Sequence, residues 1–193
     1  MTPKRAQRET RAFWALRSAR LSGVVDEPVV QIRSLEPGDE VAYNTYLLEG
    51  VRRHPHFLRI SVEDIERSPF STQGNVDRVT LLAAEGEQWL GVGSLERELG
   101  RSKRRHIAWV MRMLVLSPGR GIGRLLLREL QLRGQAMPGV EKLNLTVVLE
   151  NEAACHLYRS QGFVEFSREV DAFRYQGLGS TELSMSCRCG PLA

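Results

Sequence analysis

The sequence predicts an α/β fold in which helices cover a mixed β-sheet. Three consecutive segments, 76–86, 88–98 and 105–117, have strand composition and are separated by turn residues, which is typical of an antiparallel meander. A helix from Ile122 then separates the third segment from a strand at 140–148. A strand that follows a helical crossover usually runs parallel to its predecessor, so one sheet contains both pairings.

The elements before the meander are predicted as one strand and two helices. Alternating residues indicate a strand over 29–35, and a turn leads into a helix over 40–54 that Asp39 can cap. A short helix follows at 61–68, where a serine and an aspartate three positions later match the aspartate form of a capping box.

The elements after the meander complete the layers. The helix from Ile122 ends at the residues MPG, and its apolar positions recur at helical spacing: Ile122, Leu125, Leu126 and Leu130. Asn151 is expected to cap a helix over 152–161, and Gly162 to end it in the left-handed conformation, with Phe163 folding back as its contact. Strands at 163–170 and 181–186 are predicted to close the fold as a hairpin.

Length and charge limit the domain organisation. The 193 residues suit one domain, expected at 29–188, with a basic extension at 1–28 and a tail at 189–193. Much of the net charge of +4 lies in the first twenty residues, so charge alone does not argue for nucleic acid. No apolar run approaches the roughly 20 residues of a membrane-spanning helix, so no membrane association is expected.

The cysteines favour a reducing compartment, with the cytoplasm as the default. Three cysteines are an odd number, which argues against a disulfide framework. Cys187 and Cys189 form a C-x-C pair, but neither a second pair nor a nearby histidine completes a zinc site. The sequence therefore predicts no metal.

A glycine-rich stretch between the third meander strand and the next helix predicts an anion site. Gly119, Gly121 and Gly123 allow successive backbone NH groups to converge at a helix N-terminus, and Arg120 and Arg124 add charge. A phosphate or pyrophosphate fits best; the alternative is a turn that only links strand to helix. No lysine completes a Walker loop, and neither register of G-x-G-x-x-G ends on glycine.

The residues around this loop resemble the GNAT superfamily of acyl-coenzyme A-dependent N-acetyltransferases. The stretch MLVLSPGRGIGRLLL is followed by LNLTVVLENEAACHLYRSQGF, and the second stretch is the stronger match. The resemblance covers about Val29 to Met185. It implies a centrally splayed sheet of about seven strands with helices on both faces, and transfer of an acetyl group from acetyl-CoA to an amine acceptor, either a small molecule or a protein.

The resemblance also assigns site residues. Backbone groups of Met113, Leu114 and Val115 would contact the pantetheine arm, and the loop residues Gly119, Arg120, Gly121, Ile122, Gly123 and Arg124 would hold the pyrophosphate. Asn151 would contact the coenzyme near its sulfur. Tyr158 would act as general acid toward the departing thiolate; the alternative for Tyr158 is a core tyrosine that packs its helix onto the sheet.

The general base is less defined, because the segment 110–116 has no carboxylate. Glu96 and Glu98 share one face of the preceding strand and are the nearest candidates, with a solvated strand face as the alternative. His106 is a weaker candidate.

The loop departs from the family pattern. It is two residues shorter than family members show between the strand valine and the final glycine pair. Either Arg120 reaches around a reformed NH cradle, or a phosphate contact is lost. A non-catalytic acyl-CoA-binding module on the same fold is therefore the alternative function. The acceptor would meet segments 52–60, 68–75 and 170–181, and a homodimer is left open.

Overall fold

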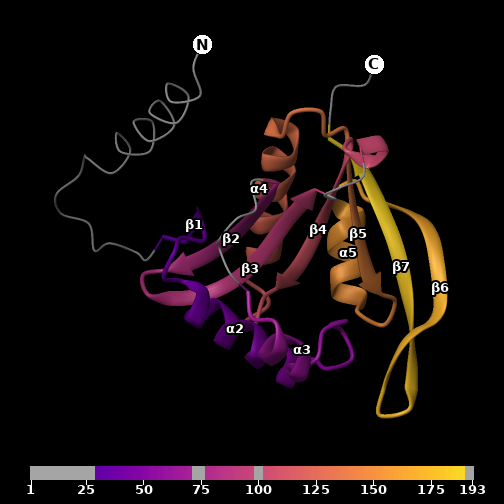
Figure 1. The fold of residues 1–193 in the computed structure, drawn as a ribbon, viewed down its shortest axis with the longest axis horizontal. Coiled ribbons are helices and arrows are strands. Elements are labelled where there is room, and N and C mark those ends of the chain that lie inside the picture. The colour runs from indigo at the N-terminus through magenta and orange to yellow at the C-terminus, as the bar shows by residue number, and fades with distance from the viewer. Residues whose placement is uncertain (1–28, 71–76, 98–101, 190–193) are drawn as a thin grey trace.

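A seven-stranded sheet in the order β1-β2-β3-β4-β5-β7-β6 forms the middle layer (Figure 1). The computed structural model describes residues 29–70, 77–97 and 102–189, so the predicted extension, Glu98 and residues 190–193 lie outside it. The elements are β1 (Gln31–Ser34), α2 (Glu40–Arg53), α3 (Val62–Arg67), β2 (Arg78–Glu85), β3 (Gln88–Arg97), the 3₁₀ turn η1 (Ser102–Arg104), β4 (Ile107–Leu114), α4 (Ile122–Ala136), β5 (Lys142–Val148), α5 (Glu152–Ser160), β6 (Val164–Tyr175) and β7 (Leu178–Arg188).

The predicted strand directions are confirmed. β2, β3 and β4 form the antiparallel meander, and the helical crossover through α4 places β5 parallel to β4. The two-residue turn between β2 and β3 begins at Gly86, whose φ of 58° is accessible without strain because glycine has no Cβ. β7 pairs antiparallel with both β5 and β6, so β6 forms one edge of the sheet.

The sheet opens in the middle. β4 and β5 pair through three positions, the last of which is Trp109 opposite Asn144. Beyond them β4 stays on β3 and β5 stays on β7, so the two strands separate toward their C-terminal ends. β4 also carries a bulge: Ser94 faces Met111 while Val92 faces Leu114, and Arg112 within the bulge has φ of 53°. The implied splay is confirmed.

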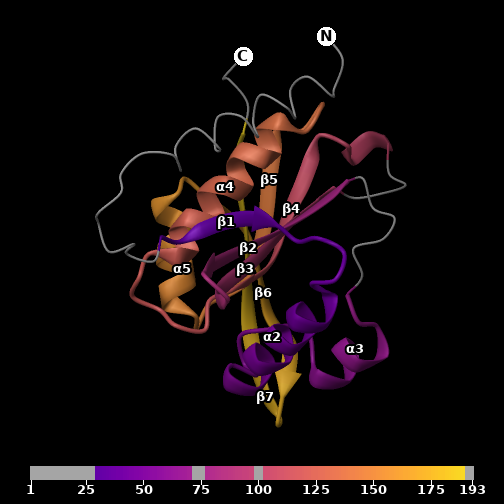
Figure 2. The same cartoon turned by 90° about the vertical axis from the view of Figure 1, so that its left-hand side faces the viewer.

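α4 and α5 lie on one face of the sheet, and α2 and α3 lie on the other (Figure 2). Two apolar cores hold the helices there. α4 and α5 pack on one face in a cluster that includes Leu126, Leu130 and Leu145, each at most 1% exposed. α2 and α3 pack on the other face, where Tyr43 and Leu47 contact the strand side chains of Leu82, Val92 and Leu114. The layers follow from the sheet being apolar on both faces over its central strands.

One apolar position of α4 differs from the prediction. Leu125 is 44% exposed, whereas Leu127 is fully buried together with Ile122, Leu126 and Leu130. Successive members of the buried i, i+4 series Ile122, Leu126, Leu130 and Gly134 are displaced around the helix by about 40°, toward the side on which Leu127 lies and away from Leu125. Arg124 and Arg128 are exposed, so neither arginine lies on the core face of α4.

The helix ends agree with the sequence signals except at Asp39. Asp39 makes no cap hydrogen bond; its carboxylate instead accepts from Arg33 and from the backbone NH of Glu36, which turns it away from α2. Ser61 and Asp64 form the predicted capping box. The predicted Asn151 cap and the left-handed Gly162 at the two ends of α5 are also present.

The C-terminal hairpin is longer than predicted. The two strands, predicted over 163–170 and 181–186, continue through segment 170–181 to a two-residue turn. Gln176 and Gly177 both have positive φ, which matches the turn type that fits twisted antiparallel strands. Bulges in β6 and exposure on both faces remove the alternation that would have revealed these strands in the sequence.

Candidate active site

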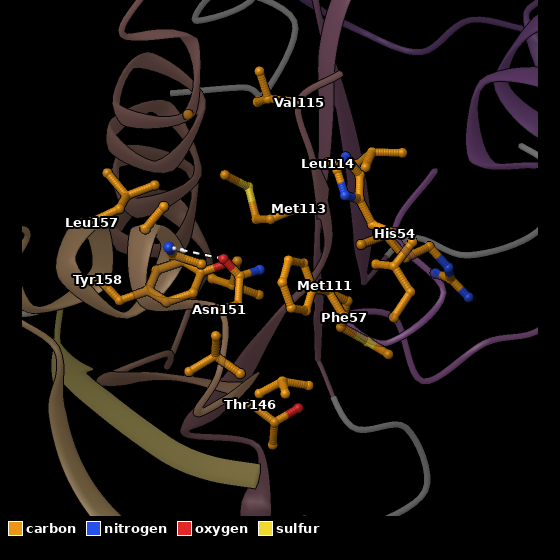
Figure 3. Close-up of a pocket in the computed structure, with 18 of the residues that line it drawn as sticks. His54, Phe57, Met111, Met113, Leu114, Val115, Thr146, Asn151, Leu157 and Tyr158 are labelled. Carbon is orange, nitrogen blue, oxygen red and sulfur yellow. Dashed lines mark hydrogen bonds between the residues drawn. The ribbon is translucent and has the colours of Figure 1, made fainter. Parts of the chain in front are cut away.

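A cleft of about 1510 Å³ passes through the opening of the sheet. On one side it is lined by the loop before α4, the start of α4 and one face of α5. On the other side it is lined by the α2–α3 loop and by residues of β5, β6 and β7. Figure 3 shows Leu157, Tyr158 and Asn151 on one wall and Met113 with Val115 on the facing strand. The cleft therefore connects the two faces of the sheet.

The strand wall contains the residues that the resemblance assigned to the coenzyme arm. Met113, Leu114 and Val115 all line the cleft. The bulge at Arg112 takes backbone out of the β3 ladder just before them, and β5 has already separated on the other side. This stretch can therefore offer main-chain groups to a ligand that lies along β4.

The glycine loop leaves the N-terminus of α4 open. Gly119 and Gly121 have φ of 96° and 71°, and a Cβ at either position would meet nothing within 4 Å. α4 begins directly after Gly121 without a side-chain cap and without an acidic residue in its first turn. A 15-residue helix with uncapped NH donors presents a partial positive charge, so the loop suits an anion.

The two loop arginines differ in direction. Arg120 donates to both carboxylate oxygens of Glu85 at the end of β2, at 3.1 and 2.6 Å, and its side chain does not line the cleft. This hydrogen bonding lowers the pKa of Glu85 from its ordinary value. Arg124 does line the cleft. In this structure Arg120 anchors the shortened loop to the β2–β3 hairpin, and Arg124 provides the cation beside the NH groups.

Both ends of α5 are fixed by backbone contacts. Asn151 caps the helix as predicted, because its Oδ1 accepts from the NH of Ala154 at 3.2 Å (Figure 3). Gly162, with φ of 86°, ends the helix in a Schellman motif: Phe163 NH donates to Tyr158 O at 3.0 Å, and the two rings are in edge contact. The helix therefore holds Tyr158 rigidly. The amide nitrogen of Asn151 makes no hydrogen bond to a described residue, and Asn151 lines the cleft.

Tyr158 belongs both to the core and to the cleft. It is 6% exposed and packs in the α4–α5 core, yet it lines the cleft, and its hydroxyl makes no hydrogen bond with any described residue. Burial raises its pKa well above the ordinary value, with a smaller contribution from Cys155. The phenol therefore keeps its proton at physiological pH, which suits a donor and excludes a tyrosinate base.

The candidate bases occupy different positions. Glu96 lines the cleft on the α2 side, but its carboxylate accepts from Arg78 at 2.8 Å and is already ion-paired. His106 is exposed before the start of β4, at the closed end of the splay, and does not line the cleft. Of the two, the structure brings only Glu96 to the cleft.

Sequence reasoning missed Glu182 of β7 and Arg59 of the α2–α3 loop. Glu182 lines the cleft at 5% exposure, with Arg59 at 3.4 Å. Glu182 shares its strand face with Ser180, Ser184 and Ser186, and such a polar face ordinarily indicates the solvent side of a strand. Its burial becomes visible only when the α2–α3 loop lies over that face.

Three further properties concern the described residues as a group. Among residues 29–70, 77–97 and 102–189, no three histidine, cysteine or acidic side chains gather as metal ligands would. Within the same ranges, every helix is too short or too polar to cross a bilayer. All three cysteines are free and buried.

Comparison with known proteins identifies the family. The family model described as the acetyltransferase (GNAT) family matches residues 42–163, which is more than half of the chain and includes β4, the glycine loop and α5. The chain therefore belongs to the GNAT acetyltransferase family. No curated protein matches it significantly.

Solved structures agree with this fold. A GNAT-family acetyltransferase from Streptococcus pneumoniae is 25% identical, with a TM-score of 0.70 over 83% of this chain and 99% of that one. A putative acetyltransferase from Salmonella typhimurium, solved with acetyl-CoA, is 16% identical with a TM-score of 0.71, covering 86% and 96%. A ribosomal-protein-alanine N-acetyltransferase from Brucella melitensis is 22% identical with a TM-score of 0.62, covering 82% and 99%.

The Asn151 cap predicts a measurable stability difference. Asn151→Ala should lower the free energy of unfolding by about 1 kcal/mol, because the NH of Ala154 loses its acceptor. Asn151→Ser supplies another cap oxygen and should stay within about 0.5 kcal/mol of the parent. Urea denaturation of the three proteins measures this, and equal losses in both variants would contradict the cap.

Proposed function

We propose that this protein transfers the acetyl group of acetyl-CoA to a primary amine by direct attack. The observation that carries the proposal is the cleft itself, which runs from an uncapped helix N-terminus past Tyr158 and into the opening of the sheet. The anion site and the proton donor thus lie in one continuous cavity with unpaired strand backbone between them.

The residues present suit acetyl-CoA. The open backbone at Gly119 and Gly121 leaves room for a pyrophosphate, and Arg124 adds a cation there. Main chain at Met113 to Val115 can pair with an extended arm, and the free amide nitrogen of Asn151 faces the same cavity. The coenzyme supplies an activated thioester.

The chain's own groups account for the charge that develops. Backbone NH groups near the β4 bulge can stabilise the oxyanion formed as the amine attacks, a contribution of about 3 kcal/mol per donor. Tyr158 then donates a hydrogen bond to the departing sulfur and stabilises the negative charge that develops there. A free thiol has a pKa of about 8.5 and burial raises the pKa of Tyr158, so complete transfer of the phenol proton to the free thiolate is unfavourable. Tyr158 therefore shares its proton with the sulfur as the C–S bond breaks, and the proton lost by the attacking nitrogen passes to solvent, from which the coenzyme A thiol is protonated.

A non-catalytic acyl-CoA-binding module is the second candidate. It is favoured by two ion pairs, because Arg120 is engaged with Glu85 and the carboxylate of Glu96 with Arg78. On that reading the same cleft would bind an acyl-CoA without transferring it.

Thiol release tests the two candidates directly. We expect free coenzyme A to appear when the protein is incubated with acetyl-CoA and a panel of amines, and mass spectrometry should find the matching N-acetyl product. Calorimetry with acetyl-CoA runs in parallel. Measurable binding without thiol release from any amine would reject the transferase and leave the module.

Replacing the phenol tests the proton donor. Tyr158→Phe should lower kcat by about ten-fold or more while the KM for acetyl-CoA stays within about two-fold, since the ring and its packing remain. Because the pKa of Tyr158 is raised, the parent enzyme should also show no loss of kcat from its ionisation below about pH 10. An unchanged kcat in the variant would remove the acid role.

A matched pair of arginine substitutions tests the loop. Arg124→Ala should raise the Kd for acetyl-CoA by about ten-fold, because a charged contact contributes about 1.5 to 3 kcal/mol. Arg120→Ala should have a smaller effect, about three-fold or less, since Arg120 is held by Glu85 outside the cleft. The reverse order, measured by calorimetry, would mean that Arg120 leaves Glu85 and binds the phosphate.

A further inference from the structure

The cleft has a second region on the α2 face of the sheet. Its floor is formed by β5 and β7, where Thr146 pairs with Ser184 and Val148 with Glu182. Leu183 points to the opposite face and packs in the α4–α5 core, so Glu182 and Ser184 face the α2 side. The α2–α3 loop forms the other wall with Phe57 among its residues.

Glu182 is a buried carboxylate with incomplete partners. It is 5% exposed and makes no hydrogen bond to any described residue. Its ion pair, Arg59 Nη1 at 3.4 Å, comes from a side chain that is 56% exposed and too distant or misaligned for a hydrogen bond. Buried carboxylates are normally satisfied by several donors, and one that lines a cavity without them can accept from a ligand.

We infer that Glu182 binds the ammonium group of the acceptor and that the acceptors are cationic amines without a nearby carboxylate. The inference rests on the proposed acetyl transfer for the identity of the ligand, but the binding site itself is defined by burial and geometry. Arg59 is ion-paired with the Glu182 carboxylate and therefore competes with the incoming ammonium for that carboxylate. Glu182 is thus a residue that determines acceptor specificity.

The neighbouring charges favour a cation. Glu169 lies directly opposite Glu182 in the β6–β7 register and also lines the cleft, and facing like charges are unfavourable without a cation between them. Two cleft arginines are already paired: Arg53 with Glu49 at 2.6 Å and Arg97 with Asp77 at 3.6 Å. A carboxylate on the acceptor would therefore meet two glutamates.

Arg112 is a further arginine of the cleft. Its Nη1 is buried and makes no hydrogen bond to a described residue. It lies near Tyr43, whose pKa is raised chiefly by burial, an effect that the positive charge of Arg112 partly offsets. Arg112 belongs to β4 and not to the floor on which Glu182 lies, which makes it the natural alternative anchor for a zwitterionic acceptor.

Opposite substitutions of the ion pair provide the test. Butylamine is titrated into the full chain and followed by protein NMR shifts, with γ-aminobutyrate as the carboxylate-bearing match and butanol as the uncharged one. Glu182→Gln should weaken butylamine binding by about ten-fold, whereas Arg59→Gln should strengthen it by about three-fold, because the competing cation is gone. The double variant should resemble Glu182→Gln.

If the Arg59–Glu182 pair were purely structural, both single variants would weaken butylamine binding. That result would overturn the inference. So would tighter binding of γ-aminobutyrate than of butylamine, which would point to Arg112. Thermal unfolding and the Kd for acetyl-CoA, expected within about two-fold of the parent, establish that each variant is folded. The titration needs no turnover, so absence of acetyl transfer would count against the proposed function and leave the Glu182 result readable.

Discussion

Loss of pairing between β4 and β5 is the constraint on which the rest of the molecule depends. After Trp109 and Asn144 the two strands no longer share hydrogen bonds, yet each keeps its outer neighbour, β3 or β7. Two rows of backbone groups are left facing a gap inside the sheet. Buried backbone groups need partners, so such a gap persists only if solvent or a ligand with amide-like groups fills it.

The helices pack against the strands that border this gap. The α4–α5 core includes Val110 of β4 together with Leu145 and Val147 of β5, and the α2–α3 core includes Leu114 of β4. Rigid contacts then fix the groups at the rim. The Schellman motif at Gly162 orients Tyr158, and the Arg120–Glu85 pair fixes the loop before α4. The cavity is therefore shaped before any ligand arrives.

Local signals in the sequence were sufficient for most of the fold. The meander, the crossover and the caps at Ser61 and Asn151 each depend on a few neighbouring residues, and these predictions were confirmed. The predicted helix cap at Asp39 was wrong, because the Asp39 carboxylate accepts hydrogen bonds from Arg33 of β1 instead. The full length of the C-terminal hairpin was not predicted, because the edge strand β6 is exposed on both faces. Its sequence therefore lacks the alternation of buried and exposed residues that indicates a strand.

Predicting the site required more than local pattern. The glycine loop and Tyr158 belong to one continuous stretch and could be assigned by resemblance, and the structure brings them to one cleft. The orientation of the Arg120 side chain toward Glu85 could not be predicted from the sequence, because Glu85 is distant in sequence. Glu182 could not be found either, because its burial depends on a loop more than a hundred residues earlier in the chain.

The α2–α3 loop and the β6–β7 hairpin meet at two points, the Arg59–Glu182 pair and the edge contact of His56 with Tyr175, whose ring centroids are 4.8 Å apart. Neither segment takes part in the glycine loop or in α5. Changes in these two segments can therefore accumulate without disturbing the machinery on the other face. Under the proposed acceptor site, such a division would let a lineage exchange one amine for another through variation of the loop and the outer end of the hairpin, while the glycine loop and α5 are inherited unchanged.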